Sequence, residues 1–386
     1  MSELYKLPKG WEWTKWQKVL NVKNGKDYKE VLNPLGEYPI YGSGGIINYA
    51  DKYLCNENSV IIGRKGTINN PLFVTEKFWN IDTAFGLESN EKYLIPMFLF
   101  YFSLQFNFLK LNTATTLPSL TKTKLQQILM PLPPLTEQKR IVTKLDSLFA
   151  KIDHAITLHQ ANIDDANALM ASVLDKVFGE LEEEYAKPKI NEVANVKGGK
   201  RVPKGSKLSE EVTPYPYLRV TDFKDYGTIS TEKMLYLSEE VYQQIKRYTI
   251  TNEDLYITNV GNTIGKSGII PSKLNGANLT ENAVKLVYKD KSITSNKYMY
   301  YFTKSSIFIT QMKLATKQMA VPKLAIKRLG EITVPFPPLQ TQQKTVHYLD
   351  AVAQKVERLK AVQSEKMQNL KALKASLLDR AFCGEL

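Results

Sequence analysis

The chain has 386 residues, of which 43% are apolar and 10% aromatic, so it has enough apolar material for folded cores and is not intrinsically disordered. Its net charge of +13 indicates a polyanionic partner, nucleic acid above all, although acidic proteins and anionic membranes remain open on charge alone. The two cysteines, Cys55 and Cys383, lie far apart without metal-ligand spacing, which excludes a disulfide framework. Because the N-terminus shows no signal peptide, we expect a cytoplasmic protein.

The sequence contains a pattern that occurs twice, 204 residues apart. Met-Pro-Leu-Pro-Pro-Leu at 130–135 corresponds to Val-Pro-Phe-Pro-Pro-Leu at 334–339, and Ser172-Val173-Leu174-Asp175 corresponds to Ser376-Leu377-Leu378-Asp379. A repeat of this length suits one domain plus a connector and is too long for a solenoid unit. We therefore predict two tandem units, each a globular part followed by one long helix.

The first globular part, residues 1–135, has short apolar runs such as 38–41, 59–62 and 71–74, separated by Gly, Asn and Pro. This pattern is typical of strands joined by exposed loops, with one or two helices before the proline-rich segment. The stretch 93–111 is apolar enough to resemble a membrane span, but proline and polar residues interrupt it, so we expect a core helix.

The segment 136–185 has apolar residues every seven positions, from Val142 to Val177, with a second apolar series three places later. This heptad pattern predicts a coiled-coil helix, roughly 65 Å long, and residues 340–386 repeat it. Since a lone apolar stripe would be exposed to water, we expect the two helices to pack on each other, and antiparallel. The first helix is acidic and the second mildly basic, which favours their pairing.

Both heptad series are interrupted at matching places, by His159 and Asn162 in the first and by Gln363 and Lys366 in the second. Two interpretations remain open. One is a solvated patch on the helix surface, and the other is a buried polar layer that fixes register and orientation.

The second globular part, residues 186–339, repeats the scheme, with expected strands at 217–220, 255–258 and 283–287. Positive charge is concentrated in the two globular parts: 15 Lys and Arg against 11 Asp and Glu in 1–135, and 23 against 13 in 188–339. Basic globular parts attached to rigid helices indicate a nucleic-acid partner.

Two loops in each unit combine cations with short hydrogen-bonding side chains. One precedes the proline-rich segment and the other is glycine-rich, at 63–68 and 259–266. Such side chains can contact base edges and phosphates, and glycines let a backbone approach a phosphate, although an ordinary solvated loop remains the alternative. The candidate DNA-binding residues are Arg64, Lys65, Thr115, Thr116, Ser119 and Lys122 in the first unit, and Arg219, Asn262, Lys266, Lys317, Gln318, Lys323 and Lys327 in the second.

Two glycine-rich motifs resemble catalytic loops, but each matches its motif only in part. Residues 261–267 resemble a phosphate-binding loop, but three residues instead of four separate the glycines. Tyr41-Gly42-Ser43-Gly44-Gly45 resembles a methyl-donor loop without its acidic partner. The sequence also shows no metal set, nucleophile with a base, or carboxylate pair. We therefore predict a non-catalytic protein that binds no cofactor itself.

Three segments form one signature: Leu132-Pro133-Pro134-Leu135-Thr136-Glu137-Gln138-Lys139-Arg140-Ile141-Val142, its second copy Phe336-Pro337-Pro338-Leu339-Gln340-Thr341-Gln342-Gln343-Lys344-Thr345-Val346, and the terminal Leu377-Leu378-Asp379-Arg380-Ala381-Phe382-Cys383-Gly384-Glu385-Leu386. With them, the whole chain resembles the specificity subunit of type I restriction-modification systems. The resemblance implies an α+β fold with a pseudo-twofold tandem repeat. Target recognition domains at 1–135 and 186–339, each mixed α/β, would be separated by conserved helices at 136–185 and 340–386 that form an antiparallel coiled coil.

The resemblance also implies a function. Each target recognition domain would read half of a bipartite, gapped DNA target, and the helices would space the domains and dock two methyltransferase (modification) subunits. Motor-nuclease (restriction) subunits can join such complexes. S-adenosylmethionine, ATP and magnesium are then expected on partner subunits only. The competing hypothesis is a two-domain scaffold that binds protein partners through its helices and reads no sequence; an enzyme is a third.

Overall fold

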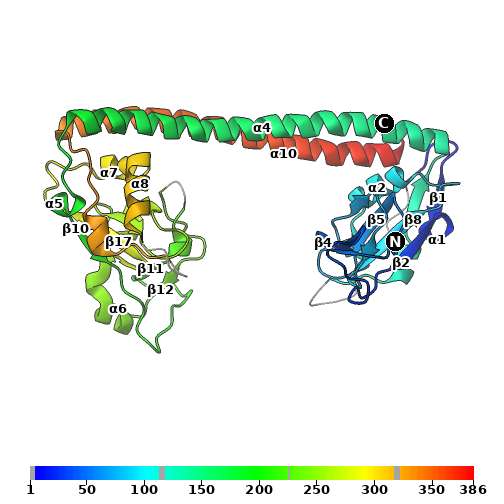
Figure 1. The fold of residues 1–386 in the computed structure, drawn as a ribbon, viewed down its shortest axis with the longest axis horizontal. Helices are drawn as coiled ribbons and strands as arrows, with labels where there is room; N and C mark the ends of the chain where they lie inside the picture. The colour runs from blue at the N-terminus through cyan, green and yellow to red at the C-terminus, as the bar shows by residue number, and fades with distance from the viewer. Residues whose placement is uncertain (1–4, 113–117, 225–226, 317–321) are drawn as a thin grey trace. The chain divides into compact units, whose positions relative to one another are not determined.

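The computed structural model describes residues 5–112, 118–224, 227–316 and 322–386 (Figure 1). The chain divides into two compact units. Unit 1 comprises Met1–Gln160 and Ser364–Leu386, and unit 2 comprises Ala161–Gln363. Each unit therefore contains one globular part and a portion of each long helix.

The strands of unit 1 are short, and their bounds are β1 (Glu12–Lys15), β2 (Leu20–Asn24), β3 (Tyr38–Gly42), β4 (Gly45–Ala50), β5 (Ser59–Gly63), β6 (Leu72–Val74), β7 (Trp79–Asn80), β8 (Ala84–Ser89) and β9 (Leu129–Leu132). One sheet has the antiparallel order β2-β8-β5-β6. In a second sheet, β3 pairs antiparallel with β4 and parallel with β7. Strands β1 and β9 form a separate antiparallel pair. The strands expected at 38–41, 59–62 and 71–74 are confirmed as β3, β5 and β6.

The core of unit 1 is built on a helix within the apolar stretch 93–111. Its α-helices are α1 (Trp16–Val19), α2 (Pro96–Gln105) and α3 (Lys122–Gln126), and residues Phe108–Leu111 form a 3-10 turn. Pro96 opens α2, where a missing N–H costs nothing. Phe98 and Leu99 are fully buried, so the expected core helix is confirmed. Among the described residues, no helix is long and apolar enough to cross a membrane.

Unit 2 repeats this arrangement. Its strands are β10 (Ala194–Gly198), β11 (Pro216–Leu218), β12 (Leu235–Tyr236), β13 (Thr249–Ile250), β14 (Leu255–Thr258), β15 (Ser267–Gly268), β16 (Ala277–Leu279) and β17 (Ala283–Tyr288). The sheet orders are β10-β17-β14-β15 and β12-β11-β16-β13. As β3 pairs parallel with β7 in unit 1, β11 pairs parallel with β16. The two globular parts thus share these pairings in a mixed α and β structure, although β13 extends the second sheet in unit 2.

The helices of unit 2 lie outside its sheets, and their bounds are α5 (Ile190–Val193), α6 (Glu239–Ile245), α7 (Asn296–Phe302), α8 (Ser306–Ala315) and α9 (Ile326–Gly330), with 3-10 turns η2 (Val220–Asp222), η3 (Lys246–Tyr248) and η4 (Ser272–Leu274). The strand expected at 217–220 ends at Leu218. It stops there because the Asp222 carboxylate accepts a hydrogen bond from the Arg219 backbone N–H, 2.8 Å away, which closes the 3-10 turn.

Two long helices, α4 (Leu135–Glu184) and α10 (Leu339–Cys383), follow the two proline pairs. Each begins directly after Pro-Pro, whose fixed φ suits a helix start. In unit 1 the two helices run antiparallel, since Asp153 of α4 bonds Lys374 of α10 at 2.9 Å while Arg140 reaches the Leu386 carbonyl at 2.7 Å. The predicted antiparallel coiled coil is confirmed.

The polar interruptions of the heptads are not buried. His159 and Gln363 are partly exposed, and Asn162 and Lys366 are exposed. A layer that fixed the register from inside would have to be enclosed. The solvated patch is therefore the interpretation that the structure supports.

A buried glutamine attaches each globular part to the helix that follows it. In unit 1 the Gln138 side chain accepts a hydrogen bond from the Ile95 N–H at 2.9 Å and donates to the carbonyls of Tyr93 and Pro133 at 2.8 and 2.9 Å. Gln342 makes the same three bonds in unit 2, as described below. Both side chains have no exposed surface. A buried amide with all of these partners fixes the angle between helix and domain.

The other long helix also contacts each globular part. In unit 1 the Phe382 ring of α10 packs on Phe98, with centroids 5.0 Å apart. In unit 2 the Phe178 ring of α4 packs on Tyr298 at 5.3 Å. Phe178 and Phe382 are again 204 residues apart. The first turns of one helix and the last turns of the other therefore support each domain.

Tyrosine hydroxyls complete this attachment. Tyr101 donates to Asp146 in unit 1, and Tyr301 donates to Asp350 at 2.6 Å in unit 2. Burial, together with the hydrogen bond to the carboxylate, raises the pKa of both tyrosines. Both hydroxyls therefore stay protonated at neutral pH and remain hydrogen-bond donors.

Replacing the buried glutamine of unit 2 tests this attachment. Gln342→Leu would leave the Ser295 N–H and the carbonyls of Ile293 and Pro337 without their partner. Because each buried unsatisfied group costs about 1–3 kcal/mol, we expect a loss of about 3 kcal/mol in the free energy of unfolding, measured by urea denaturation. The control is the neighbouring Gln343→Leu, on an exposed side chain, which should change stability by less than about 0.5 kcal/mol. Equal midpoints for the two variants would contradict the attachment role.

Candidate nucleic-acid interface

The two candidate loops of unit 1 lie side by side, although more than fifty residues separate them in the sequence. Lys65 and Ser119 form an isolated antiparallel β-bridge. The Gly66 N–H donates to the Pro118 carbonyl at 3.1 Å, and the Leu120 N–H donates to the Arg64 carbonyl at 2.9 Å. The glycine-rich loop and the loop before the proline-rich segment therefore form a single structure.

Unit 2 builds the same pairing from different residues. Val260 and Lys323 form the bridge, and the Gly261 N–H donates to the Pro322 carbonyl at 3.0 Å. The Leu324 N–H donates to the Asn259 carbonyl at 2.9 Å. We call these structures, residues 64–66 with 118–120 and residues 259–261 with 322–324, the paired loops.

Each pair of loops has a glycine in the left-handed region at the same place. Gly66 has φ +74° and Gly261 has φ +85°. A Cβ on either would meet nothing within 4 Å, so these positions require glycine for the backbone conformation and not for space. The backbone at both turns faces open space, where another molecule can approach it closely.

The predicted residues of unit 1 gather around its paired loops. Lys65 is exposed, and Ser119, opposite it, is partly exposed. Arg64 points toward the body of the unit, with its guanidinium 5.8 Å from the Phe85 ring centroid. Lys122 begins α3, two residues beyond the loop. Thr115 and Thr116 lie outside the described residues.

The predicted residues of unit 2 fall into two groups. Asn262 and Lys323 are exposed at the paired loops, and Lys327 is exposed on α9, close by in the chain. Lys266 instead donates to the Phe223 carbonyl at 3.2 Å. Arg219 is bonded to Asp222 at 2.7 Å and to the Lys233 carbonyl at 2.6 Å. Lys317 and Gln318 lie outside the described residues.

The side chains of Lys266 and Arg219 therefore have structural partners within unit 2. Their ammonium and guanidinium groups brace the segment that connects β11 to β12, and part of their hydrogen-bonding capacity is already used. A DNA contact by either residue stays a prediction.

Sequence reasoning missed a group of cations beside the paired loops of unit 2. The Asn259 N–H bonds the Asn282 carbonyl at 3.0 Å, and the adjacent Glu281 pairs with exposed Arg201 at 2.6 Å. Next to Arg201, the Lys200 ammonium lies 5.8 Å from the centroid of the Tyr248 ring, which also contacts Arg247. The Gly198-Gly199-Lys200 tract was the available signal, because glycines before a cation mark an exposed strand end.

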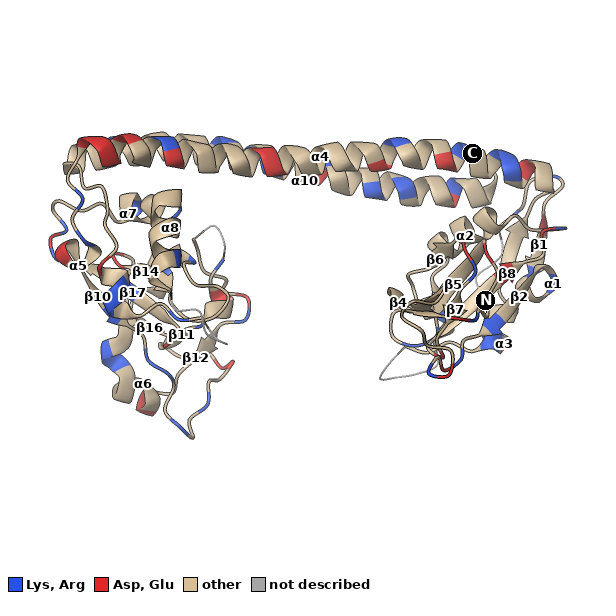
Figure 2. Cartoon of the chain, in the orientation of Figure 1, with Lys and Arg blue, Asp and Glu red and all other residues tan. Residues whose placement is uncertain are grey.

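Figure 2 marks Lys and Arg positions, in blue, on α3 and the loops of unit 1 and around β10, β17 and α6 of unit 2. Among the residues that the structure describes, Lys65 and Lys323 form no ion pair with a carboxylate. A basic surface with exposed backbone turns suits a phosphate-bearing polymer.

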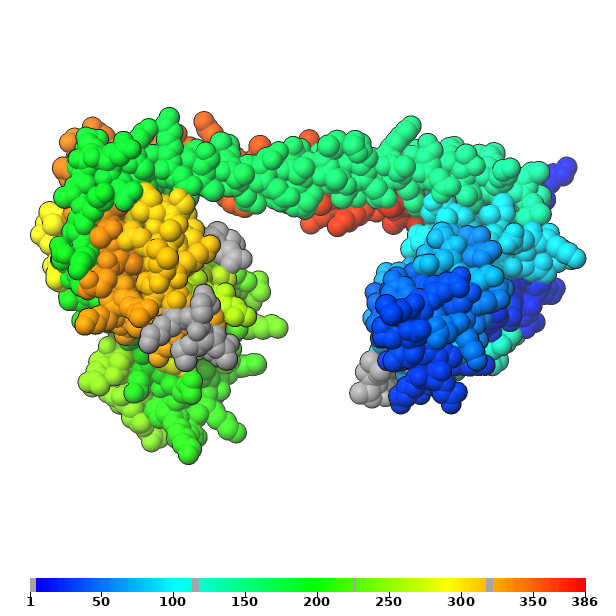
Figure 3. All heavy atoms as spheres, viewed as in Figure 1, coloured from blue at the N-terminus to red at the C-terminus, as the bar shows by residue number. Residues whose placement is uncertain are grey.

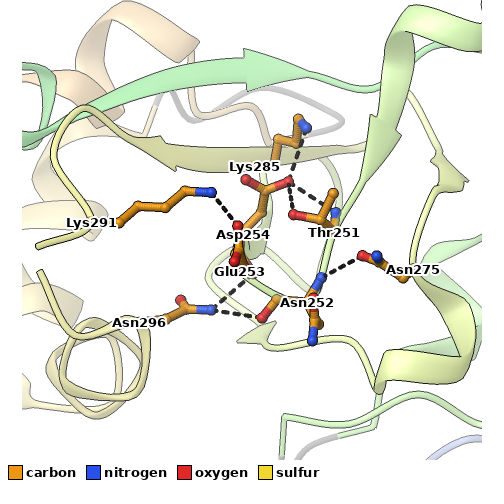
Figure 4. Close-up of polar contacts among 8 residues, drawn as sticks. All are labelled: Thr251, Asn252, Glu253, Asp254, Asn275, Lys285, Lys291 and Asn296. Atoms are coloured by element: carbon orange, nitrogen blue, oxygen red, sulfur yellow. Dashed lines mark hydrogen bonds and ion pairs between the residues drawn. The ribbon is translucent and has the colours of Figure 1, made fainter.

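The most enclosed ion pair among the described residues of unit 2 belongs to a turn (Figure 4). The Lys285 ammonium lies 2.9 Å from the Asp254 carboxylate, and their side chains are only 14% and 5% exposed. Asp254 also accepts hydrogen bonds from the backbone N–H and hydroxyl of Thr251. Asn296 binds the carbonyls of Asn252 and Asp254, which fixes the turn before β14. These groups are paired with one another and leave no carboxylate free for acid–base chemistry.

Metal ligands are not grouped in the structure. Within residues 5–112, 118–224, 227–316 and 322–386, no three His, Cys, Asp or Glu side chains come together in a way that could bind a metal ion. Cys55 is buried beside Asn80, and burial raises the pKa of its thiol to about 12. This cysteine is therefore a packing residue and not a nucleophile.

The helix pair of unit 2 has an open apolar groove of about 630 Å³. Its walls include Leu169 of α4 and Tyr348, Val352 and Leu359 of α10. Leu169, Tyr348 and Leu359 are 55%, 51% and 43% exposed, so the coiled coil does not cover them. Exposed apolar side chains in a contiguous groove mark a surface that another protein can cover.

Known proteins of one kind match this chain. A family model described as type I restriction modification DNA specificity domain matches residues 8–160 and 182–366. A putative type I restriction enzyme specificity subunit from Haemophilus influenzae is 25% identical, covering 88% of this chain and 86% of its own. The EcoBI specificity subunit from Escherichia coli is 24% identical, covering 95% and 81%.

Solved structures agree on the fold. A chain from a study of complex assembly and conformational transition of the type I R-M system superposes with a TM-score of 0.76 at 22% identity, covering 99% of this chain and 100% of its own. The HsdS subunit from Thermoanaerobacter tengcongensis gives 0.51 at 22% identity, with 99% of both chains covered. With a family model that spans both globular parts, the resemblance seen in the sequence is confirmed, and the chain belongs to the family of type I restriction-modification specificity subunits.

Proposed function

We propose that this chain is the DNA-recognition subunit of a type I restriction-modification complex, in which each globular part reads one half of a bipartite, gapped target. The observation that carries the proposal is the recurrence of the paired loops. Both units join a glycine turn to the loop before the proline-rich segment, and both expose a lysine at the bridge, Lys65 or Lys323.

The chemistry of the paired loops suits duplex DNA. The left-handed turns at Gly66 and Gly261 allow the backbone to lie close to a phosphate, and the exposed lysines neutralise its charge. Ser119 and Asn262 carry short polar groups that can reach base edges. Because the two loops of a pair are hydrogen-bonded to each other, these groups are positioned before DNA arrives, which lowers the entropy cost of binding.

The long helices are proposed to set the spacing between the two half-sites. A helix of 50 residues, such as α4, is about 75 Å long, and one turn of B-DNA is about 34 Å. The buried glutamines fix each globular part to a helix, so helix length is converted into distance along DNA.

Methyltransferase subunits are the proposed partners of the helices. The apolar groove beside Leu169 and Leu359 supports this role because it offers a helix-lined surface that the chain itself does not cover. We propose that catalysis, with S-adenosylmethionine, ATP and magnesium, takes place on partner subunits, and that motor-nuclease subunits can join. The structural pairing of Asp254 with Lys285, and the burial of Cys55, support a non-catalytic role for this chain.

The proposal is tested by mapping methyladenine across the genome of cells that carry the cognate methyltransferase, with this chain present or deleted. We expect a gapped two-part motif that disappears on deletion, and exchange of residues 1–135 for those of a relative should alter one half only. Methylation that persists without the chain, or an ungapped motif, would instead favour a scaffold that reads no sequence.

Lysine substitutions in unit 2 test the DNA contacts. Lys323→Ala with Lys327→Ala should weaken binding to all sequences and flatten the salt dependence by about one slope unit per lost phosphate contact, because fewer counterions are released. The measurement is DNA affinity between low and moderate salt by fluorescence anisotropy. Lys317, which lies outside the described residues, is a further candidate for this series.

The matched control is Lys289→Ala, an exposed lysine just beyond β17, at the end of that strand opposite to Ala283. Its removal should leave the salt slope unchanged. If the Lys323 and Lys327 variant kept the wild-type slope as well, these lysines would not contact DNA.

Helix deletions test the spacing role. Removal of one heptad from each helix, residues 156–162 and 363–369, should shorten the gap by about three base pairs, because seven residues rise about 10 Å. The half-sites should not change, and methylome mapping would show both results. A deletion of four residues from each helix disrupts the apolar seam and serves as the control for loss of assembly. An unchanged gap in an active heptad variant would rule out the helices as the spacer.

A further inference from the structure

The hairpin between β3 and β4 of unit 1 has an unusual tip. The turn is Gly42-Ser43-Gly44-Gly45, and a Cβ on Gly44 or Gly45 would meet nothing within 4 Å. The next two residues, Ile46 and Ile47, are 49% and 50% exposed. Two aliphatic side chains therefore lie in water beside a turn that has almost no side chains of its own, on a strand at the edge of its sheet (Figure 1).

This tip lies beside the end of β5, the strand that leads into the paired loops of unit 1. A Cβ on Gly63, the residue before Arg64, would lie 3.1 Å from the Cβ of Ser43. The Ile81 N–H donates to the Tyr41 carbonyl at 3.0 Å, and the Arg64 N–H donates to the Thr83 carbonyl at 2.7 Å. The hairpin and the paired loops are thus neighbours in unit 1. Figure 3 shows the N-terminal segment that includes β3 and β4, in dark blue, at the surface of unit 1.

We propose that Ile46 and Ile47 recognise thymine, by contact with its 5-methyl group in the major groove of the half-site that unit 1 binds; this proposal rests on the proposed function. A two-stranded ribbon fits the major groove, and thymine is the base that presents a methyl group there. The glycines make the tip thin enough for the ribbon to enter beside the sugar-phosphate backbone. The isoleucines have no hydrogen-bonding group, so the base feature that they can read is apolar.

Among the described residues of unit 2, the segment that follows the strand matching β3 carries no pair of exposed isoleucines. In unit 2 the strand that matches β3 is β11, and it continues into the η2 turn instead of a glycine hairpin. Arg219 stands where that turn begins and is bonded to Asp222. The two half-sites are therefore read with different chemistry, and the half-site of unit 2 provides an internal control.

Deoxyuridine gives a direct test, because it pairs as thymine does and lacks the methyl group. The full chain, in complex with its methyltransferase subunits, would be titrated with duplexes of the mapped target in which each thymine of the unit 1 half-site is replaced in turn. Wild type should lose about fourfold in affinity at one position or more, the value expected for one buried methyl group. The Ile46→Ala, Ile47→Ala double variant should bind the thymine and deoxyuridine duplexes equally.

Two controls accompany this comparison of thymine and deoxyuridine duplexes. Deoxyuridine in the unit 2 half-site should affect wild type and the double variant alike. Leu104→Ala, on a 40% exposed leucine of α2, should keep the wild-type response to deoxyuridine. Thermal melting confirms that each variant is folded.

Several results would overturn the proposal. One is that wild type binds every deoxyuridine duplex as tightly as the thymine duplex. Another is that the losses from deoxyuridine and from the double variant add. The third is a unit 1 half-site that contains only G·C pairs. Each of them leaves the proposed function standing if wild type still prefers the gapped target. A wild-type complex without that preference overturns the proposed function itself, and this inference with it.

Discussion

Two buried glutamines determine how the globular parts of this protein relate to its helices. Gln138 and Gln342 have no exposed surface, and each bonds a backbone N–H and two carbonyls that come from both the domain and the helix start. Glutamine is a rare residue in such a place, since an amide that lost its partners there would be strongly destabilising. The bonds therefore fix the angle at which each domain leaves its helix. Any spacing function of the helices depends on that angle.

Further contacts attach each domain to both long helices. Each domain rests on the first turns of one helix through Asp146 or Asp350, and on the last turns of the other through Phe382 or Phe178. These contacts repeat at the same sequence offset as the proline-rich segments. A tandem repeat has thus become a structure with internal symmetry, in which the paired loops of the two units are free to differ. Arg64 and Lys65 occupy the turn in unit 1 where Asn259 and Val260 stand in unit 2.

The sequence predicted elements whose signal is local. Heptads predicted the two long helices and their pairing, and the apolar stretch 93–111 predicted the core helix α2. The pairing of the two loops in each unit was not predictable, because a bridge between Lys65 and Ser119 joins residues far apart in the chain. For the same reason the partners of Lys266 were hidden, since it bonds a carbonyl forty-three residues away. Gln138 gave no signal at all, because a glutamine in a polar helix start is expected to be exposed. The glycine run at 42–45 resembled a cofactor loop, yet it forms a hairpin tip.

The division of the chain has a consequence for its synthesis. Unit 2 is built from one continuous segment, Ala161–Gln363, whereas unit 1 needs both Met1–Gln160 and Ser364–Leu386. Domains usually fold in the order in which the ribosome releases them. Here the globular part that emerges first lacks Phe382 and Ala381, which are fully buried in its core cluster, until residues 364–386 have been made. Unit 2 can therefore be completed before unit 1, because unit 1 closes only when the segment that follows unit 2 in the chain has been synthesised.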